Sequence, residues 1–160
     1  MKLMIFAGMA ALPLAALHAQ APATPATYVM KAGAGDQYEI QSSKLVLQST
    51  RNAKLRQFAQ MMVQDHTKST ADVTTAAKQA RLAPKPPMLD AKGKADVVAL
   101  RKATGTGRDR LYVTQQKAAH QKALALHQGY AANGTAAPLK AVAAQVAPVV
   151  QTHITELQAM

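Results

Sequence analysis

The sequence predicts an all-α protein: a four-helix bundle of two antiparallel hairpins, joined by a long crossover that contains a short helix. Three observations lead to this prediction. Apolar residues recur at steps of three and four along four long stretches. The composition is rich in alanine and only 4% aromatic, which favours closely packed helices over sheets. Residues 82–107 are broken by prolines and glycines and divide the four stretches into two pairs.

The N-terminus has the pattern of a secretory signal peptide. Lys2 is followed by an apolar run over residues 3–17 and by the small residue Ala19. The run is too short to span a bilayer comfortably, so we assign residues 1–19 to a signal peptide cleaved after Ala19. Residues 20–27 are expected to be a flexible lead-in to a bundle domain over residues 28–158. We therefore expect a secreted protein, located in a bacterial periplasm, with no transmembrane segment in its mature chain.

The absence of cysteine excludes disulfides and thiolate metal ligands. The formal net charge is +11, and loss of Lys2 with the signal peptide would lower it to +10. Such a charge is expected to draw the protein to anionic envelope components, including lipopolysaccharide and phospholipid headgroups. The basic residues are scattered and no nucleic-acid motif accompanies them, so we expect no specific nucleic-acid partner.

The first hairpin is predicted from two helical stretches, at about residues 28–49 and 52–81. The second stretch has the clearest period. The short join near Thr50 predicts that the two helices are antiparallel neighbours. The expected inward positions of the first helix are Tyr28, Ala32, Gly35, Glu39, Ser42 and Val46, and those of the second are Leu55, Phe58, Met62, His66, Ser69, Val73, Ala76 and Ala80.

Prolines at 84, 86 and 87 end the second helix and begin the crossover. Asp90 is expected to cap a short helix over residues 91–102. Val97, Val98 and Leu100 of this helix are expected to be buried, and the Thr-Gly-Thr-Gly sequence at 104–107 ends it.

The second hairpin is predicted from helices at about residues 108–132 and from Pro138 onward, with a stop at Asn133-Gly134. A hairpin, a 26-residue connection and a second hairpin is the connectivity of ferritin-like bundles. The expected inward positions are Asp109, Tyr112, Gln116, Ala119, His120, Ala123, His127 and Tyr130, then Leu139, Val142, Val146, Val149, His153 and Leu157.

These stretches also contain a recognisable series of short motifs. They are Phe58-Ala59, Met62-Val63, Asp65-His66, Gly105-x-x-x-Asp109-x-x-Tyr112-Val113 with His120, Leu139-Lys140, Ala147-Pro148-Val149 and His153. With these motifs the chain resembles the exported bacterial family of unknown function DUF4142, whose members are often labelled outer-membrane or periplasmic proteins. The resemblance covers about residues 28–157 and implies a ferritin-like bundle without an established activity. Arg108 departs from the family pattern, which tends to have an aromatic residue there.

Three histidines and a glutamate lie on the apolar stripes of four different helices: Glu39, His66, His120 and His153. Surface histidines have no reason to follow an apolar period, so we expect a polar cluster in the interior. Such a cluster could hold a divalent transition metal such as zinc, iron, manganese or copper. Asp65, Asp109 and Glu156 could add oxygens or orient the imidazoles from outside the ligand set.

Other interpretations of the same residues remain open. The histidines could be neutral core groups bonded to carboxylates, tyrosines or backbone carbonyls. Asp36 and Glu39 could form a capping box if the first helix begins at Asp36. His127 is expected to be partly exposed. A di-iron oxidase site is not expected, because the chain has only two glutamates and lacks the Glu-x-x-His pairs of that site.

We therefore expect a non-enzymatic exported bundle with an envelope or stress-related role, a cationic surface and no required cofactor. No glycine-rich phosphate loop or serine-centred elbow indicates a hydrolase or nucleotide-binding protein. The alternative, from a different class, is a metal-binding or redox bundle that uses Glu39, His66, His120 and His153.

Overall fold

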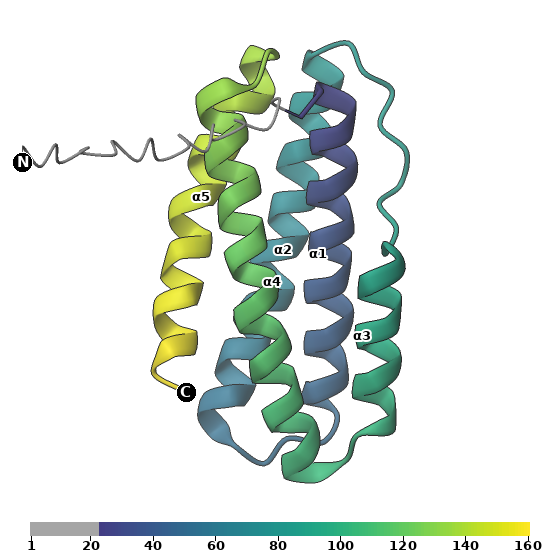
Figure 1. Ribbon diagram of the computed structural model, residues 1–160, viewed down its shortest axis with the longest axis vertical. Helices are drawn as coiled ribbons and strands as arrows, with labels where there is room; N and C mark the ends of the chain where they lie inside the picture. The colour runs from purple at the N-terminus through teal and green to yellow at the C-terminus, as the bar shows by residue number, and fades with distance from the viewer. Residues whose placement is uncertain (1–22) are drawn as a thin grey trace, which may run out of the picture.

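The computed structural model describes residues 23–160, and the signal peptide expected at residues 1–19 lies outside this range. All regular secondary structure in the described range is helical, which confirms the predicted all-helical class. The five helices are α1 (Pro25–Leu47), α2 (Ala53–Gln79), α3 (Ala91–Lys102), α4 (Gly105–Asn133) and α5 (Ala137–Gln158) (Figure 1).

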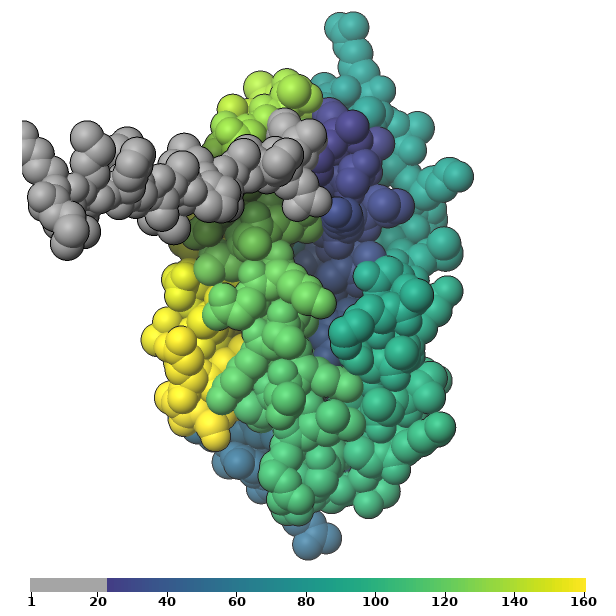
Figure 2. Space-filling model, viewed as in Figure 1, coloured from purple at the N-terminus to yellow at the C-terminus, as the bar shows by residue number. Residues whose placement is uncertain are grey.

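The four long helices lie side by side, and the shorter α3 packs against α1 and α4 (Figure 1). Each short turn joins two helices that contact each other extensively, α1 with α2 and α4 with α5. The pairs meet where α1 packs on α4 and α2 packs on α5. Figure 2 shows that side chains of α3 and α4 cover much of α1 on this face of the molecule.

Helix α1 begins at Pro25, three residues earlier than the sequence predicted. The Thr24 hydroxyl accepts a hydrogen bond from the backbone N–H of Thr27 at 3.2 Å, and a proline at the first helical position suits the start of a helix. Asp36 therefore lies in the middle of α1 and is buried, so the capping-box interpretation of Asp36 and Glu39 is wrong.

Helix α2 is bounded by local hydrogen bonds at both ends. The side chain of Asn52 accepts from the backbone N–H of Leu55 at 3.1 Å. At the other end Arg81 has a left-handed φ of 60°, and the Leu82 N–H donates to the carbonyl of Ala77 at 3.0 Å. This pattern is a Schellman motif, which satisfies the last carbonyls and turns the chain out of the helix.

The segment after α2 lies against α1 at Gly33. A Cβ atom at Gly33 would come within 2.8 Å of Pro87, so only glycine allows this approach without a shift. Asp90 then caps α3 by accepting from the Gly93 N–H at 2.6 Å, as predicted. Val98, which we expected to be buried, is exposed.

Arg108 ties together the ends of three helices. Its guanidinium donates to the carbonyls of Leu100 and Ala103, at 3.0 and 2.8 Å, and to the Ser49 hydroxyl at 2.9 Å. The side chain thus ties the end of α1 and the end of α3 to the first turn of α4.

The interior consists of two apolar clusters with a polar layer between them. Helix α1 illustrates the order: Tyr28 and Ala32 join one cluster, Glu39 and Ser42 follow, and Val46 joins the other. Because the helices run antiparallel, the same order recurs in reverse on α2. Residues central to the two clusters are Tyr28, Val73, Tyr130 and Leu139 on one side, and Phe58, Met62, Tyr112 and Leu157 on the other.

Two predicted inward positions of the long helices are exposed. Gly35 is exposed and its neighbour Asp36 is buried instead, while Val149 is exposed and Val150 takes the core position. Five further predicted inward residues are only partly buried: Ala80, Asp109, Ala119, Ala123 and Val146. No helix within residues 23–160 is long and apolar enough to cross a bilayer.

Candidate metal centre

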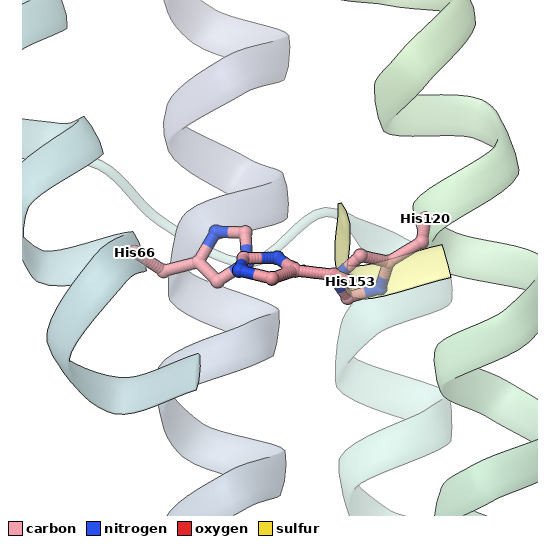
Figure 3. A group of neighbouring side chains, drawn as sticks. All are labelled: His66, His120 and His153. Carbon is pink, nitrogen blue, oxygen red and sulfur yellow. The ribbon is translucent and has the colours of Figure 1, made fainter. Parts of the chain in front are cut away.

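The polar layer contains three buried imidazoles from three helices. His66 comes from α2, His120 from α4 and His153 from α5. One ring nitrogen of each lies within 4.8 Å of one ring nitrogen of each of the others. Figure 3 shows the rings pointing toward one another between the helices. The predicted convergence of these histidines in the interior is therefore present in the structure.

The hydrogen bond of His120 to its own helix determines its tautomer. Its Nδ1 lies 3.0 Å from the carbonyl oxygen of Gln116, and because a carbonyl only accepts, Nδ1 must carry the proton. Burial, reinforced by the positive charges of His66 and His153, lowers the pKa of His120 to about 3. The ring is therefore neutral, and its Nε2 presents a bare lone pair.

His153 is held by the carboxylate of Asp65. Its Nε2 donates to Oδ2 of Asp65 at 3.0 Å, so a neutral ring has its lone pair on Nδ1. Burial lowers the pKa of His153, although the hydrogen bond to Asp65 opposes this. Nδ1 of His153 lies 3.3 Å from Nε2 of His120. With both rings neutral, two lone pairs face each other across this contact.

His66 is anchored in the same way by Asp36 on α1. Its Nδ1 donates to Oδ1 of Asp36 at 2.8 Å, and its Nε2 is buried without a hydrogen-bond partner among the described residues. Burial alone would lower the pKa of His66, but the bond to Asp36 and the negative charges of Glu39, Asp36 and Asp65 outweigh burial and raise it. His66 is thus the ring of the three that most readily accepts a proton.

Glu39 adds a carboxylate to this layer. Its Oε1 lies 3.6 Å from Nδ1 of His120, and its Oε2 is buried without a partner among residues 23–160. Burial raises the pKa of Glu39 to about 7, against the opposing effects of the His66 charge and the Gln116 side chain. Glu39 can therefore change its protonation near neutral pH.

Of the three carboxylates that we expected around the imidazoles, the structure places only that of Asp65 beside them. Asp65 contacts His153 directly. Asp109 instead accepts from the Thr50 hydroxyl at 3.0 Å, beside the α1–α2 turn. It lies eleven residues before His120, about 16 Å along an α-helix. Glu156 lines a surface hollow at the end of α5.

Sequence reasoning missed Asp36, which holds His66 and also accepts from the Thr70 hydroxyl at 3.1 Å. Asp36 lies three residues before Glu39 on α1, and this spacing could have predicted that both side chains share one inward face. The prediction that His127 is partly exposed is also wrong. His127 is buried, and its Nδ1 shares a hydrogen bond of 3.0 Å with the Tyr28 hydroxyl. Burial lowers the pKa of His127 to about 4 and keeps the ring neutral.

Comparisons with known proteins place this geometry in context. A search of curated proteins found no match. CopM, solved in its Cu(II)-bound form, is similar over 86% of this chain and 95% of its own, with 16% identity and a TM-score of 0.71. A DUF305 protein from Streptomyces coelicolor, described as a candidate secreted protein, is similar over 84% of this chain and 88% of its own, with 14% identity and a TM-score of 0.69. At these identities the likeness concerns the fold alone.

The sequence itself matches one family model over nearly its whole length. The model is that of the Domain of unknown function (DUF4142), and it covers residues 11–160. The chain therefore belongs to the DUF4142 family.

Proposed function

We propose that this protein binds one transition-metal ion in its interior, through the imidazoles of His66, His120 and His153. One observation carries the proposal. Each ring is fixed by a hydrogen bond from one nitrogen, to Asp36, to the Gln116 carbonyl or to Asp65, and the other nitrogen turns toward the remaining rings. Outer acceptors that fix the tautomer are the usual support of histidine ligands in metal sites.

The spacing of the rings fits a small metal ion. Two nitrogens bound at the usual zinc–nitrogen distance in a tetrahedral site lie about 3.3–3.4 Å apart. The His120–His153 distance is 3.3 Å. Since all three nitrogens lie within 4.8 Å, ligation by His66 as well requires an inward shift of about 1.5 Å at most to reach that geometry. Glu39 is not in this group, because its Oε1 lies beside Nδ1 of His120, the nitrogen opposite the proposed ligand atom.

Imidazole nitrogens suit zinc, copper, iron and nickel, whereas an all-oxygen site would suit magnesium or calcium. The fold similarity to a copper-bound protein supports copper as the first ion to test, and zinc is the natural comparison. The rival interpretation is a closed hydrogen-bond network. It does not account for the lone pairs that meet between His120 and His153, or for the unpartnered Nε2 of His66.

We also propose the wider setting that the sequence predicted. The signal-peptide pattern of residues 1–19 supports export to the periplasm, and the net charge of +11 supports contact with anionic envelope components. Two helix pairs joined through a long connection support a ferritin-like four-helix bundle. A binding role without catalysis fits these features.

The test is metal binding by protein made without a histidine tag. Metal content after purification and titration with Cu²⁺ and Zn²⁺ should give one ion per chain. His66→Ala, His120→Ala and His153→Ala should each lower the affinity by at least about tenfold, a typical cost of damaging a metal site. His127→Ala is the matched control and should keep the affinity, because its ring pairs with Tyr28. Unchanged affinity in all three cluster variants would refute the proposal.

A further inference from the structure

The groups that contact the three rings differ sharply in exposure. The side chains of Asp36 and Glu39 are each 4% exposed, and Gln116 is fully buried. The side chain of Asp65 is 33% exposed, although its Oδ2 is bonded to His153, whose own side chain is 2% exposed. Asp65 therefore connects solvent to a buried ring by a single hydrogen bond.

We propose that Asp65 is the access point of the site: its carboxylate captures a hydrated divalent cation between α2 and α5 and passes it to His153. This inference rests on the proposed metal binding. The bond to His153 engages Oδ2, which leaves Oδ1 able to contact a cation from the solvent side. Displacing that one bond frees the His153 ring to turn toward the incoming ion.

The charge of the protein makes a local acid necessary. A chain with a net charge of +11 repels cations at long range, so an ion needs a site of negative potential where it approaches. Asp72, the other exposed acid on α2, is already paired with Lys68. Asp65 forms its ion pair with His153, and it has no lysine or arginine partner among the described residues.

A second route is conceivable through a hollow at the ends of α2 and α5. Lys54, Phe58 and Glu156 are among the residues that line it. Its inner wall is the buried Phe58 ring, which packs edge-on against His153 with ring centroids 6.3 Å apart. An ion there would pass the positive Lys54 and displace a core aromatic residue. The Asp65 route requires only the loss of one hydrogen bond.

The experiment measures association and dissociation rates of Co²⁺, followed by visible absorption in a stopped-flow instrument. Asp65→Asn keeps an oxygen that accepts from His153 but loses the charge. We expect it to slow association by about tenfold or more, within the range of electrostatic effects on association, while any weaker hold on the His153 ring appears separately as faster dissociation. Asp65→Glu keeps the charge and should restore the rates. Asp72→Asn and Glu156→Gln are the matched controls and should leave the rates unchanged.

The outcomes separate the two proposals. If wild-type protein fails to bind Co²⁺, Cu²⁺ or Zn²⁺ at equilibrium, the proposed function fails. If it binds, three results overturn the access role alone: unchanged association in Asp65→Asn, a loss confined to faster dissociation, or slower association in Glu156→Gln with normal rates in Asp65→Asn. The second would make Asp65 a positioning residue, and the third would assign access to the hollow at Phe58.

Discussion

Nε2 of His120 faces Nδ1 of His153 at 3.3 Å, and both nitrogens are the ones left without a proton when the rings are neutral. The opposite nitrogens are committed to the Gln116 carbonyl and to the Asp65 carboxylate. A contact between two lone pairs in a buried site is unfavourable, and only a shared proton or a cation relieves it. This relationship distinguishes the cluster from an ordinary buried histidine network.

The tautomer of His120 can be tested directly. Imidazole nitrogen NMR of the metal-free protein should show the proton on Nδ1 and no titration of this ring above about pH 4, because its pKa is lowered to about 3. In the unfolded chain His120 takes up a proton near pH 6.5, whereas in the folded protein its ring stays neutral until the pH approaches 3. The contribution of His120 to the free energy of unfolding is therefore complete above pH 6.5 and declines as the pH falls toward 3. A proton on Nε2 would contradict the tautomer, and a ring that titrates near pH 6.5 would contradict the lowered pKa.

Replacing Asp36 by Asn should weaken metal binding without contacting the ion. The carboxylate fixes the Nδ1 proton of His66 through a buried bond and accepts from Thr70 through a partly buried one. We expect a loss of about 10–100-fold in metal affinity, as for other outer partners of histidine ligands. The free energy of unfolding should fall by about 1–3 kcal/mol in urea denaturation. Asp72→Asn, on the exposed face of α2, is the control and should change neither quantity.

Glu39→Gln should remove the pH dependence of stability that the buried carboxyl group of Glu39 imposes. Burial raises the pKa of Glu39 from 4.5 to about 7, so the folded state holds a proton that the unfolded chain has already released. Stability contributed by the neutral acid is thus lost as the pH rises through this window. In the metal-free state the glutamine variant should gain stability relative to wild type between pH 4.5 and 7. Parallel profiles for the two proteins would contradict the raised pKa.

Tyr28→Phe should affect stability but not the metal. The hydroxyl of Tyr28 is hydrogen-bonded to Nδ1 of His127 in the apolar cluster above the polar layer, and the Tyr28 ring stacks on Tyr130 with centroids 4.0 Å apart. Removing the hydroxyl leaves a buried Nδ1 without its partner, at a cost of about 1–3 kcal/mol in the free energy of unfolding. Metal stoichiometry and affinity, measured by titration, should equal those of wild type. A loss of metal would place the Tyr28–His127 pair within the site.

The helices and their inward faces could largely be predicted, because a buried stripe must repeat with the helical period. The same logic placed Glu39, His66, His120 and His153 on inward faces, but it did not predict whether the two hairpins hold them at one level. The prediction failed at single positions whose neighbours on the same stripe were placed correctly. It exchanged Gly35 for Asp36 and Val149 for Val150, and the first of these errors hid the acid that anchors His66.

Interactions between helices were beyond what periodicity can predict. The pairing of Asp65 with His153 and of Asp109 with Thr50 depends on the relative rotation and height of helices that are distant in sequence. The start of α1 was missed for a local reason: Pro25 was assigned to the lead-in, although Thr24 and Pro25 together make a strong helix start. The burial of His127 depends on Tyr28, which is 99 residues away.

X-ray absorption spectroscopy of the zinc-loaded protein tests the central claim most directly, because it counts the imidazoles bound to the ion. We predict scattering from three imidazole rings, with nitrogen at about 2.0–2.1 Å from the metal, and from two rings in a His153→Ala variant. A wild-type spectrum dominated by oxygen, or an imidazole count that is the same in the variant, would contradict a metal centre built from His66, His120 and His153.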